Sequence, residues 1–333
     1  MEENANTVAD KSRIGAEPVV PARPGPPLGL VIAAFAAVYI IWGSTYLGIR
    51  LAVDSIPPFL MAGSRFILAG TFLYAVMRAR GAKRPEGRQW LSATVIGALL
   101  LLVGNGAVSW AQTRAPTGVT SLIVASVPLW MMLIEWFRPQ GRRPKVITVF
   151  GLCIGFAGVS VIVASRNPIG HRVLDPVAGG VLLFASFCWA LGSIYSRHAN
   201  KPANPLLAIS MQMFAGGVLL VLTGVLFGEA GHFTFGGITR TSLWAFVYLT
   251  LVGSLVGFTA YVWLLQVSTP SRVSTYAYVN PVIAVFLGHL VLKEEIPKTV
   301  VLAGMLVLAS VVLITVQSGA TSPRLTNKAS EAV

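Results

Sequence analysis

Charge is scarce in this chain of 333 residues: only 11% of them are Asp, Glu, Lys or Arg, whereas 55% are hydrophobic. The mean hydropathy is +0.73. So little polar surface cannot coat a water-soluble globule of this size, so the composition predicts a membrane protein in contact with the lipid bilayer. The net charge of +13 does not indicate nucleic-acid binding, because Lys and Arg cluster in short connections between apolar runs.

Groups that carry chemistry are also few. The two cysteines, Cys153 and Cys188, lie inside apolar runs, which favours small buried hydrophobes over a disulfide or a metal site. The four histidines are scattered without ligand spacing, so we expect no metal, no cofactor and no enzyme activity. All twelve Asp and Glu residues lie in tails, loops or ends of apolar runs, which favours facilitated transport over coupling through a deep carboxylate.

Long apolar runs are what the sequence has in abundance. A hydrocarbon core of about 30 Å needs about 20 apolar residues per helix. Residues 1–27 contain mixed charges and five prolines, which predicts a disordered tail, and residues 318–333 form a second tail. Between the tails we expect ten transmembrane helices near residues 28–49, 58–77, 90–111, 117–137, 145–164, 176–197, 204–227, 242–265, 272–292 and 298–317.

The distribution of basic residues predicts the orientation. Connections on the side shared by both termini contain 17 Lys and Arg residues, and those on the opposite side contain 7. Because cytoplasmic connections are enriched in positive charge, both termini are predicted to be cytoplasmic. Most of the bias comes from the first half of the chain.

The chain partly repeats itself at an offset of 153 residues. Gly104, Ala107, Trp110, Ser121, Pro128, Lys145 and Gly151 are matched by Gly257, Ala260, Trp263, Ser274, Pro281, Lys298 and Gly304. With small gaps, the segment from Gly43 to Tyr46 also aligns with that from Gly192 to Tyr195, and Pro58 aligns with Pro205. Each copy has five spans, an odd number, so the second copy is expected to be inverted relative to the first.

Several motifs occur in order along this two-repeat layout. They are Trp42 to Tyr46, the pair Arg65-Phe66, Pro128, and Tyr276 to Pro281 followed by Glu294-Glu295. With them the chain resembles the drug/metabolite transporter superfamily, and within it the ten-helix EamA-domain exporters of bacterial inner membranes. The resemblance implies two inverted five-helix EamA-type repeats, residues 28–164 and 176–317, enclosing a central substrate cavity. It also implies export of amino acids or other small metabolites, and sometimes of toxic compounds.

Two prolines are the first candidates for a role in transport. Pro128 and Pro281 each fall about ten residues into a span. A proline there removes one backbone hydrogen bond and can kink the helix, and freed backbone at that depth is tolerated only against protein or a wet cavity. A cavity-lining or hinge role is favoured over a packing kink because the feature occurs in both copies.

Polar and aromatic side chains at comparable depth form a second set of candidates. An aromatic-lined cavity with a few hydrogen-bonding groups suits amphipathic organic molecules. The competing interpretation, an interfacial anchor near a span end, applies to Trp42, Trp110 and Trp263, so Tyr276, Tyr278 and Asn280 are the stronger candidates. The set comprises Trp42, Ser44, Thr45, Tyr46, Asn105, Trp189, Ser193, Gln212, Tyr261, Tyr276, Tyr278 and Asn280.

Arg65 is the one basic residue well inside a span. An unpaired charge there is costly, so the side chain must face the bundle interior, a water-filled cavity or a carboxylate. It could bind a substrate carboxylate or hold a neighbouring helix. The second role is favoured, because no buried acidic partner is evident and Arg can extend toward an interface.

These observations predict a transporter; an enzyme and a channel are alternatives that the sequence supports less. We expect export of small metabolites such as aromatic or neutral amino acids, by alternating access through a central cavity. The alternative is a broad-specificity drug or metabolite efflux carrier, proton-coupled or not. We further expect a monomer in a bacterial inner membrane.

Overall fold

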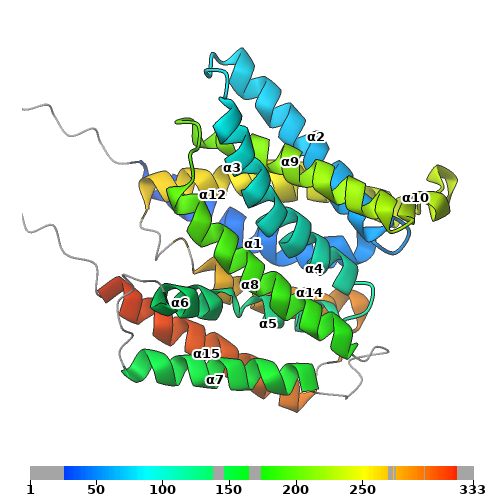
Figure 1. Cartoon of the computed structure of the whole chain (residues 1–333). Coiled ribbons are helices and arrows are strands. Elements are labelled where there is room, and N and C mark those ends of the chain that lie inside the picture. Colours follow the sequence, from blue (N-terminus) through cyan, green and yellow to red (C-terminus); the bar gives the residue numbers. More distant parts are fainter. Residues whose placement is uncertain are drawn as a thin grey trace, which may run out of the picture.

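The computed structural model describes residues 26–137, 146–164, 174–268, 273, 275–295 and 297–320. Within these ranges all regular elements are helices (Figure 1). The predicted N-terminal tail therefore lies almost entirely outside the described residues, and the last helix runs to Ala320, past the expected start of the C-terminal tail.

The helices of the first half are α1 (Leu28–Ala52), α2 (Pro58–Ala79), α3 (Gly87–Gly97), the π-helix η1 (Ala98–Asn105), α4 (Gly106–Ala111), α5 (Thr117–Val124), α6 (Val127–Phe137) and α7 (Val146–Ala164). Those of the second half are α8 (Pro176–His198), α9 (Pro205–Leu226), α10 (Glu229–His232), the 3-10 helix η2 (Phe235–Gly237), α11 (Arg240–Tyr248), the π-helix η3 (Leu249–Val256), α12 (Gly257–Val267), α14 (Tyr276–Leu292) and α15 (Lys298–Ala320).

Seven helical segments of the described chain are long and apolar enough to cross a membrane: Leu28–Ala52, Pro58–Ala79, Gly87–Ala111, Thr117–Phe137, Pro176–His198, Pro205–Leu226 and Arg240–Leu265. Three shorter apolar helices, Val149–Ile162, Val279–Leu292 and Lys298–Leu313, fall within the other three predicted spans. The predicted class, a helical multi-pass membrane protein, is thereby confirmed.

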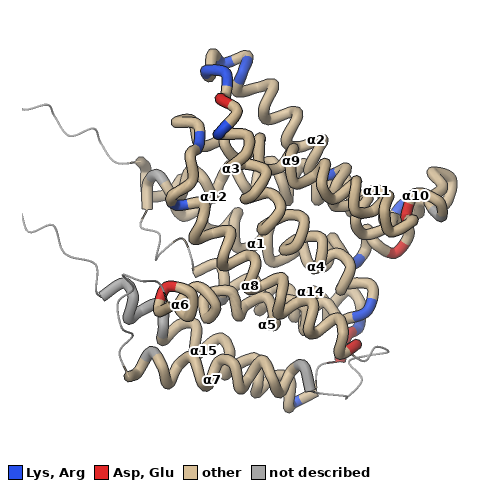
Figure 2. The backbone as a smooth tube through the Cα atoms, in the orientation of Figure 1, with Lys and Arg blue, Asp and Glu red and all other residues tan. Residues whose placement is uncertain are grey.

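Side chains are distributed as a bilayer requires. Figure 2 shows Lys, Arg, Asp and Glu mainly near the ends of the helices, with few along their middles. Large apolar side chains such as Phe72, Phe184 and Phe286 are exposed on the helices. In water this exposure would be unfavourable, whereas in lipid it costs nothing.

Two pairs of helices frame the bundle. Helix α2 packs against α9, and α7 packs along α15 at the opposite side of the molecule (Figure 1). Between these pairs, α1 contacts α11, α12 and α14, while α8 contacts η1, α5 and α6. The interior is thus built from helices that are far apart in the sequence.

Three helices of the second half are capped by the residue that directly precedes them. Asp175 and Asn204 precede a proline that occupies the first turn of α8 and α9, and their side-chain oxygens accept hydrogen bonds from backbone N–H groups of that turn. Thr239 does the same for α11. A capped N-terminus satisfies N–H groups that would otherwise lack partners in an apolar surrounding.

Two helices of the first half are capped from the second half. The backbone N–H groups of Phe59 and Leu60, at the start of α2, donate to the Glu229 carboxylate at 3.2 and 2.9 Å. Those of Thr117 and Gly118, at the start of α5, donate to the Glu294 carboxylate at 2.8 and 3.2 Å. These carboxylates favour both helix N-termini electrostatically and tie the two halves together.

The two acids are placed by the same local geometry. Each directly follows a residue with left-handed backbone, Gly228 (φ 78°) and Lys293 (φ 57°), which turns the chain at the end of α9 or α14. The carboxylate then folds back over a glycine: a Cβ added at Gly224 would lie 2.9 Å from Glu229 Oε2, and one at Gly288 would lie 2.6 Å from Glu294 Oε2. Burial raises the pKa of Glu229, an effect that its backbone hydrogen bonds partly offset.

Three of the predicted spans are not continuous α-helices, although uninterrupted helices were expected. The third and eighth predicted spans contain the π-helical segments η1 and η3, each eight residues long. The fourth span is divided at Ala125 and Ser126, between α5 and α6. Short π-helical stretches inside α-helices are often found at functional sites.

Candidate functional site

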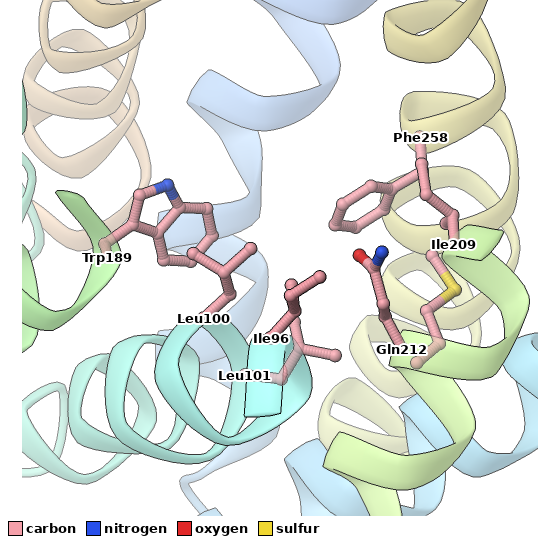
Figure 3. A pocket seen from close by; sticks show the side chains of 8 residues that line it. Ile96, Leu100, Leu101, Trp189, Ile209, Gln212 and Phe258 are labelled. Carbon is pink, nitrogen blue, oxygen red and sulfur yellow. The ribbon is translucent and has the colours of Figure 1, made fainter. Parts of the chain in front are cut away.

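A cavity lies between α3–η1, α8, α9 and α12 (Figure 3). Its lining is mostly apolar, with Gln212 as the polar exception and Trp189 on the opposite wall. Its volume is about 30 Å³. That room suits a few water molecules. The lining residues are Ile96, Leu100, Leu101, Trp189, Ile209, Gln212, Met213 and Phe258.

Two of the predicted site residues, Trp189 and Gln212, line this cavity. The Gln212 amide points toward its interior, beside Phe258 (Figure 3). Trp189 packs on the π-helical segment, where a Cβ added at Gly104 would lie 2.6 Å from the Trp189 ring. The small residue therefore lets the indole approach the backbone closely. Ser193, one turn further along α8, donates its hydroxyl to the Trp189 carbonyl at 2.7 Å.

An aromatic cluster adjoins the cavity through Phe258. The Trp42 ring lies 5.2 Å from the Phe258 ring, 4.9 Å from that of Tyr261 and 5.1 Å from that of Tyr276. The Tyr261 and Tyr276 rings are 5.9 Å apart and nearly perpendicular, at 86°. Such tilted and edge-to-face pairs are the favoured geometry of aromatic packing. Trp42 is thus partly buried within this aromatic cluster.

The remaining candidates on α1 form hydrogen bonds with neighbouring residues of the bundle. The Ser44 hydroxyl lies 2.6 Å from the Tyr248 hydroxyl, and Thr45 donates to the Trp42 carbonyl at 2.6 Å. Tyr46 packs against the main apolar core, and its carbonyl accepts from the Gln112 amide at 3.2 Å. Of these three side chains, Ser44 bonds to another helix, Thr45 bonds within α1, and none lines the cavity.

Arg65 is buried, with 3% of its surface exposed. One guanidinium nitrogen donates to Asn105 Oδ1 at 2.7 Å, and the group lies over the Phe66 ring at 4.3 Å. Its Nε atom has no hydrogen-bond partner among the described residues. Two predicted site residues, Arg65 and Asn105, are therefore brought together, and neither lines the cavity.

The two repeated prolines have different surroundings. Pro128 follows the division of its span, in the first turn of α6, where a missing N–H leaves no hydrogen bond unmade. Pro281 is buried inside the continuous helix α14. The expected break is therefore seen at the first proline, and the second is accommodated without one.

Asn280 is buried beside Pro281 and joins two helices. With its side-chain amide oriented so that its hydrogen-bonding groups have suitable partners, the Asn280 nitrogen donates to the carbonyl oxygens of Tyr39 and Tyr276 at 3.2 Å each. These bonds hold α14 against α1. The side chain of the neighbouring candidate Tyr278 lies outside the described part of the structure.

Most of the cavity lining was not among the predicted site residues. Ile96, Leu100, Leu101, Ile209 and Met213 are ordinary apolar residues of membrane helices, so no sequence signal separates them from packing residues. Phe258 could have been found, because it directly follows a glycine of the repeated set.

The fold and the site define a class of protein. Apolar helices from both halves line a small cavity, which an aromatic cluster adjoins through Phe258. Helices of a multi-pass membrane protein that meet in this way from two halves of the chain are typical of a transporter of small molecules.

Comparison with known sequences gives the family. The profile of the EamA-like transporter family matches residues 28–164 and residues 178–316. The chain belongs to this family and is a membrane transporter. The expected resemblance to EamA-type members of the drug/metabolite transporter superfamily is thereby confirmed.

Several proteins are similar along most of their length. The uncharacterized inner membrane transporter YedA of Escherichia coli (strain K12) is 37% identical over 289 residues, 86% of this chain and 90% of its own. The uncharacterized transporter YvbV of Bacillus subtilis (strain 168) is 27% identical over 286 residues, 86% and 91% of the two chains. A crystal structure with 21% identity superposes with a TM-score of 0.59 over 87% of this chain and 99% of that chain, so the fold is shared.

Proposed function

We propose that this transporter exports small metabolites such as aromatic or neutral amino acids, by alternating access through the central cavity. One observation carries the proposal: the cavity receives side chains from both regions that match the family. Ile96, Leu100 and Leu101 come from the first, and Trp189, Ile209, Gln212, Met213 and Phe258 from the second. A site shared by two halves opens to one side or the other when the halves move relative to each other.

The proposed architecture is ten transmembrane helices in two inverted repeats, residues 28–164 and 176–317. The double family match supports it, as does the occurrence of a π-helical segment at matching places, η1 and η3. Helices at the same position in each repeat, α2 with α9 and α7 with α15, also pack against each other. Two equivalent helices that pack against each other are expected beside a two-fold axis in the membrane plane.

We place the protein as a monomer in a bacterial inner membrane with both termini in the cytoplasm. The excess of Lys and Arg on one side supports the orientation. The similarity to the inner membrane transporter YedA supports the location.

The chemistry around the cavity supports an aromatic or neutral substrate. The Phe258 ring lines the cavity and is backed by the Trp42 ring, which also packs on Tyr261 and Tyr276. Gln212 offers both a donor and an acceptor. Because a cavity of about 30 Å³ is too small for an amino acid, the helices must separate before a substrate can bind.

The second candidate function, a broad-specificity efflux carrier, is favoured by one observation. Gln212 is the single residue among those lining the cavity with a fully polar side-chain end. An almost wholly apolar wall binds lipophilic compounds of many shapes and discriminates little among them.

Facilitated transport is supported by where the acids are. Asp54, Glu86, Asp175 and Glu295 lie in connections, and Glu135 lies in the last turn of α6. Glu229 and Glu294 are bonded to helix N-termini. Among the described residues, no carboxylate lies at the middle of a span, where a proton-coupling acid is commonly found.

Counterflow in proteoliposomes tests the proposal. The purified full-length protein is presented with a panel of radiolabelled amino acids, with and without a proton gradient. We expect accumulation of aromatic or other neutral amino acids that does not require the gradient. Movement of a lipophilic cation without movement of any amino acid would favour the broad-specificity carrier.

A further inference from the structure

Where α2 crosses α9, two close contacts between the helices are related by symmetry. A Cβ added at Gly217 on α9 would lie 2.9 Å from the carbonyl oxygen of Gly63 on α2. A Cβ added at Gly70 on α2 would lie 2.8 Å from the carbonyl oxygen of Ser210 on α9. Exchanging residue i of α2 with residue i+147 of α9 turns the first contact into the second. The two helices therefore run antiparallel about a local two-fold axis.

This exchange relates Arg65 to Gln212. The same shift of 147 residues relates Pro58 to Pro205, at the starts of the two helices. Arg65 and Gln212 each lie seven residues after that proline. The two polar side chains thus hold equivalent positions in the two halves.

Their neighbours correspond as well. Asn105, which contacts Arg65, follows Gly104, and Phe258, which lies beside Gln212, follows Gly257. Gly104 and Gly257 are related by the repeat offset of 153. The pair Arg65 and Asn105 is therefore the counterpart of the pair Gln212 and Phe258.

The two equivalent places differ in openness. Gln212 and Phe258 line the cavity (Figure 3). Arg65 is closed off, with 3% of its surface exposed and a hydrogen bond to Asn105. When inverted repeats exchange conformations, the place that is closed in one state is open in the other. The counterpart of the present cavity would then open at Arg65.

Within the described part of the chain, the charge of Arg65 has no counter-ion. No carboxylate of the described residues lies within ion-pair distance of its guanidinium, and its Nε atom has no hydrogen-bond partner among them. Asn105 supplies a neutral acceptor only. A buried cation without an anion is unfavourable, and in membrane segments such a residue commonly serves a substrate pathway.

We propose that Arg65, with Asn105 beside it, binds the carboxylate of the transported molecule in the state opposite to the one described here. The inference rests on the proposed function and restricts its substrates to organic molecules that contain a carboxylate. A guanidinium presents paired N–H groups that match a carboxylate in plane and spacing. In the present state Asn105 Oδ1 occupies one of those donors in place of the substrate.

Ligand binding to the purified full-length protein, followed by tryptophan fluorescence, tests this role. The probes are phenylalanine, phenylalaninol, in which an alcohol replaces the carboxylate, and 3-phenylpropionate, which has the carboxylate without the amine. We expect the wild-type protein to bind the two carboxylates at least tenfold more tightly than phenylalaninol. Arg65→Gln should remove this preference and leave phenylalaninol binding unchanged. Arg240→Gln, which removes an exposed cation, is the matched control.

A second variant separates binding from folding. Asn105→Asp places a carboxylate on the guanidinium, so it should keep or raise the thermal stability while it weakens phenylalanine binding about tenfold. A purely structural arginine would instead lose affinity for all three probes together in Arg65→Gln and keep phenylalanine binding in Asn105→Asp. Either of those results overturns the inference.

The outcomes for the wild-type protein distinguish this inference from the proposed function. Binding of 3-phenylpropionate without phenylalanine, lost in Arg65→Gln, supports the role of Arg65 and rejects amino acids as substrates. Binding of phenylalanine that Arg65→Gln leaves intact rejects the role of Arg65 alone. Failure to bind either carboxylate rejects both.

Discussion

Helices α2 and α9 correspond to each other in the two halves, yet their N-termini are completed in different ways. Asn204 caps α9 from the adjacent position, through bonds of 3.0 and 3.2 Å from the backbone N–H groups of Leu206 and Leu207. Helix α2 has no such residue, and Glu229 caps it from the other half of the chain. One helix can therefore begin by local interactions, whereas the other needs the tertiary structure.

The same difference separates other helices. Helices α8 and α11 are capped by the local residues Asp175 and Thr239, whereas α5 is capped by Glu294. In the first half, α3 has a local capping pair, formed by Glu86 and Gln89. The comparison indicates that α2 and α5 are completed by association with the second half, which makes Glu229 and Glu294 part of the contact between the halves.

The largest expected effect is at the crossing that relates α2 to α9. Gly70→Ala would place a methyl group 2.6 Å from the Phe214 backbone nitrogen, so the helices must separate. We expect a loss of about 2–3 kcal/mol in the free energy of unfolding. Thermal unfolding in detergent measures it. Gly180→Ala on α8, which meets nothing within 4 Å, is the control and should not lower stability. Equal stabilities would show that the crossing is not close.

The next effect concerns the cap of α5. Glu294→Ala leaves the N–H groups of Thr117 and Gly118 without partners in a buried place, for an expected loss of about 1–2 kcal/mol. Glu295, its exposed neighbour, provides the matched control Glu295→Ala. The same thermal measurement compares them. If both variants unfold at the same temperature, the contact with α5 contributes nothing.

A smaller effect is expected at the local cap of α9. Asn204→Ala removes the acceptor for Leu206 and Leu207, which typically costs about 1 kcal/mol. Since Asn204 has no ionisable group, this loss should be the same at every pH at which the protein is folded. A loss that changes with pH would mean that Asn204 acts through a titrating neighbour.

The smallest expected effect on stability is at the cap of α2, where, unlike at the cap of α9, the contribution of the capping residue should depend on pH. Burial raises the pKa of Glu229 above its usual 4.5, so the folded protein binds the proton more tightly than the unfolded chain. The contribution of Glu229 to stability is therefore larger at low pH and falls as the pH rises from 4.5 through the raised value. Glu229→Gln does not titrate, so its unfolding temperature should vary less over that interval. Parallel profiles for the two proteins would contradict this assignment.

The positions of the helices were largely predictable. The spans expected at 204–227 and 58–77 are found as Pro205–Leu226 and Pro58–Ala79, because each begins with a proline, a residue that is favoured in the first turn of a helix. The π-helical segments were not predictable, since η1 has the same composition as an ordinary apolar helix.

The candidate site was predictable in its polar and aromatic members only. Trp42, Tyr261 and Tyr276 were selected separately and are found in contact, and Arg65 is found with Asn105. The apolar wall of the cavity could not be selected, because a leucine that lines a cavity and a leucine that packs look alike in a sequence. The two prolines had a shared signal, yet Pro128 lies in the first turn of a helix and Pro281 lies inside one.

The sequence by itself determined that this chain is a helical membrane protein and where most of its helices run, because transfer from water to lipid depends on the composition of about 20 consecutive residues. It also contained the local caps, whose partners are adjacent. Only the tertiary structure decided which helix Glu229 and Glu294 complete, where the cavity lies, and that Arg65 and Gln212 are equivalent. These features depend on contacts between segments more than 100 residues apart, such as Phe59 with Glu229 at a separation of 170, which local composition does not specify.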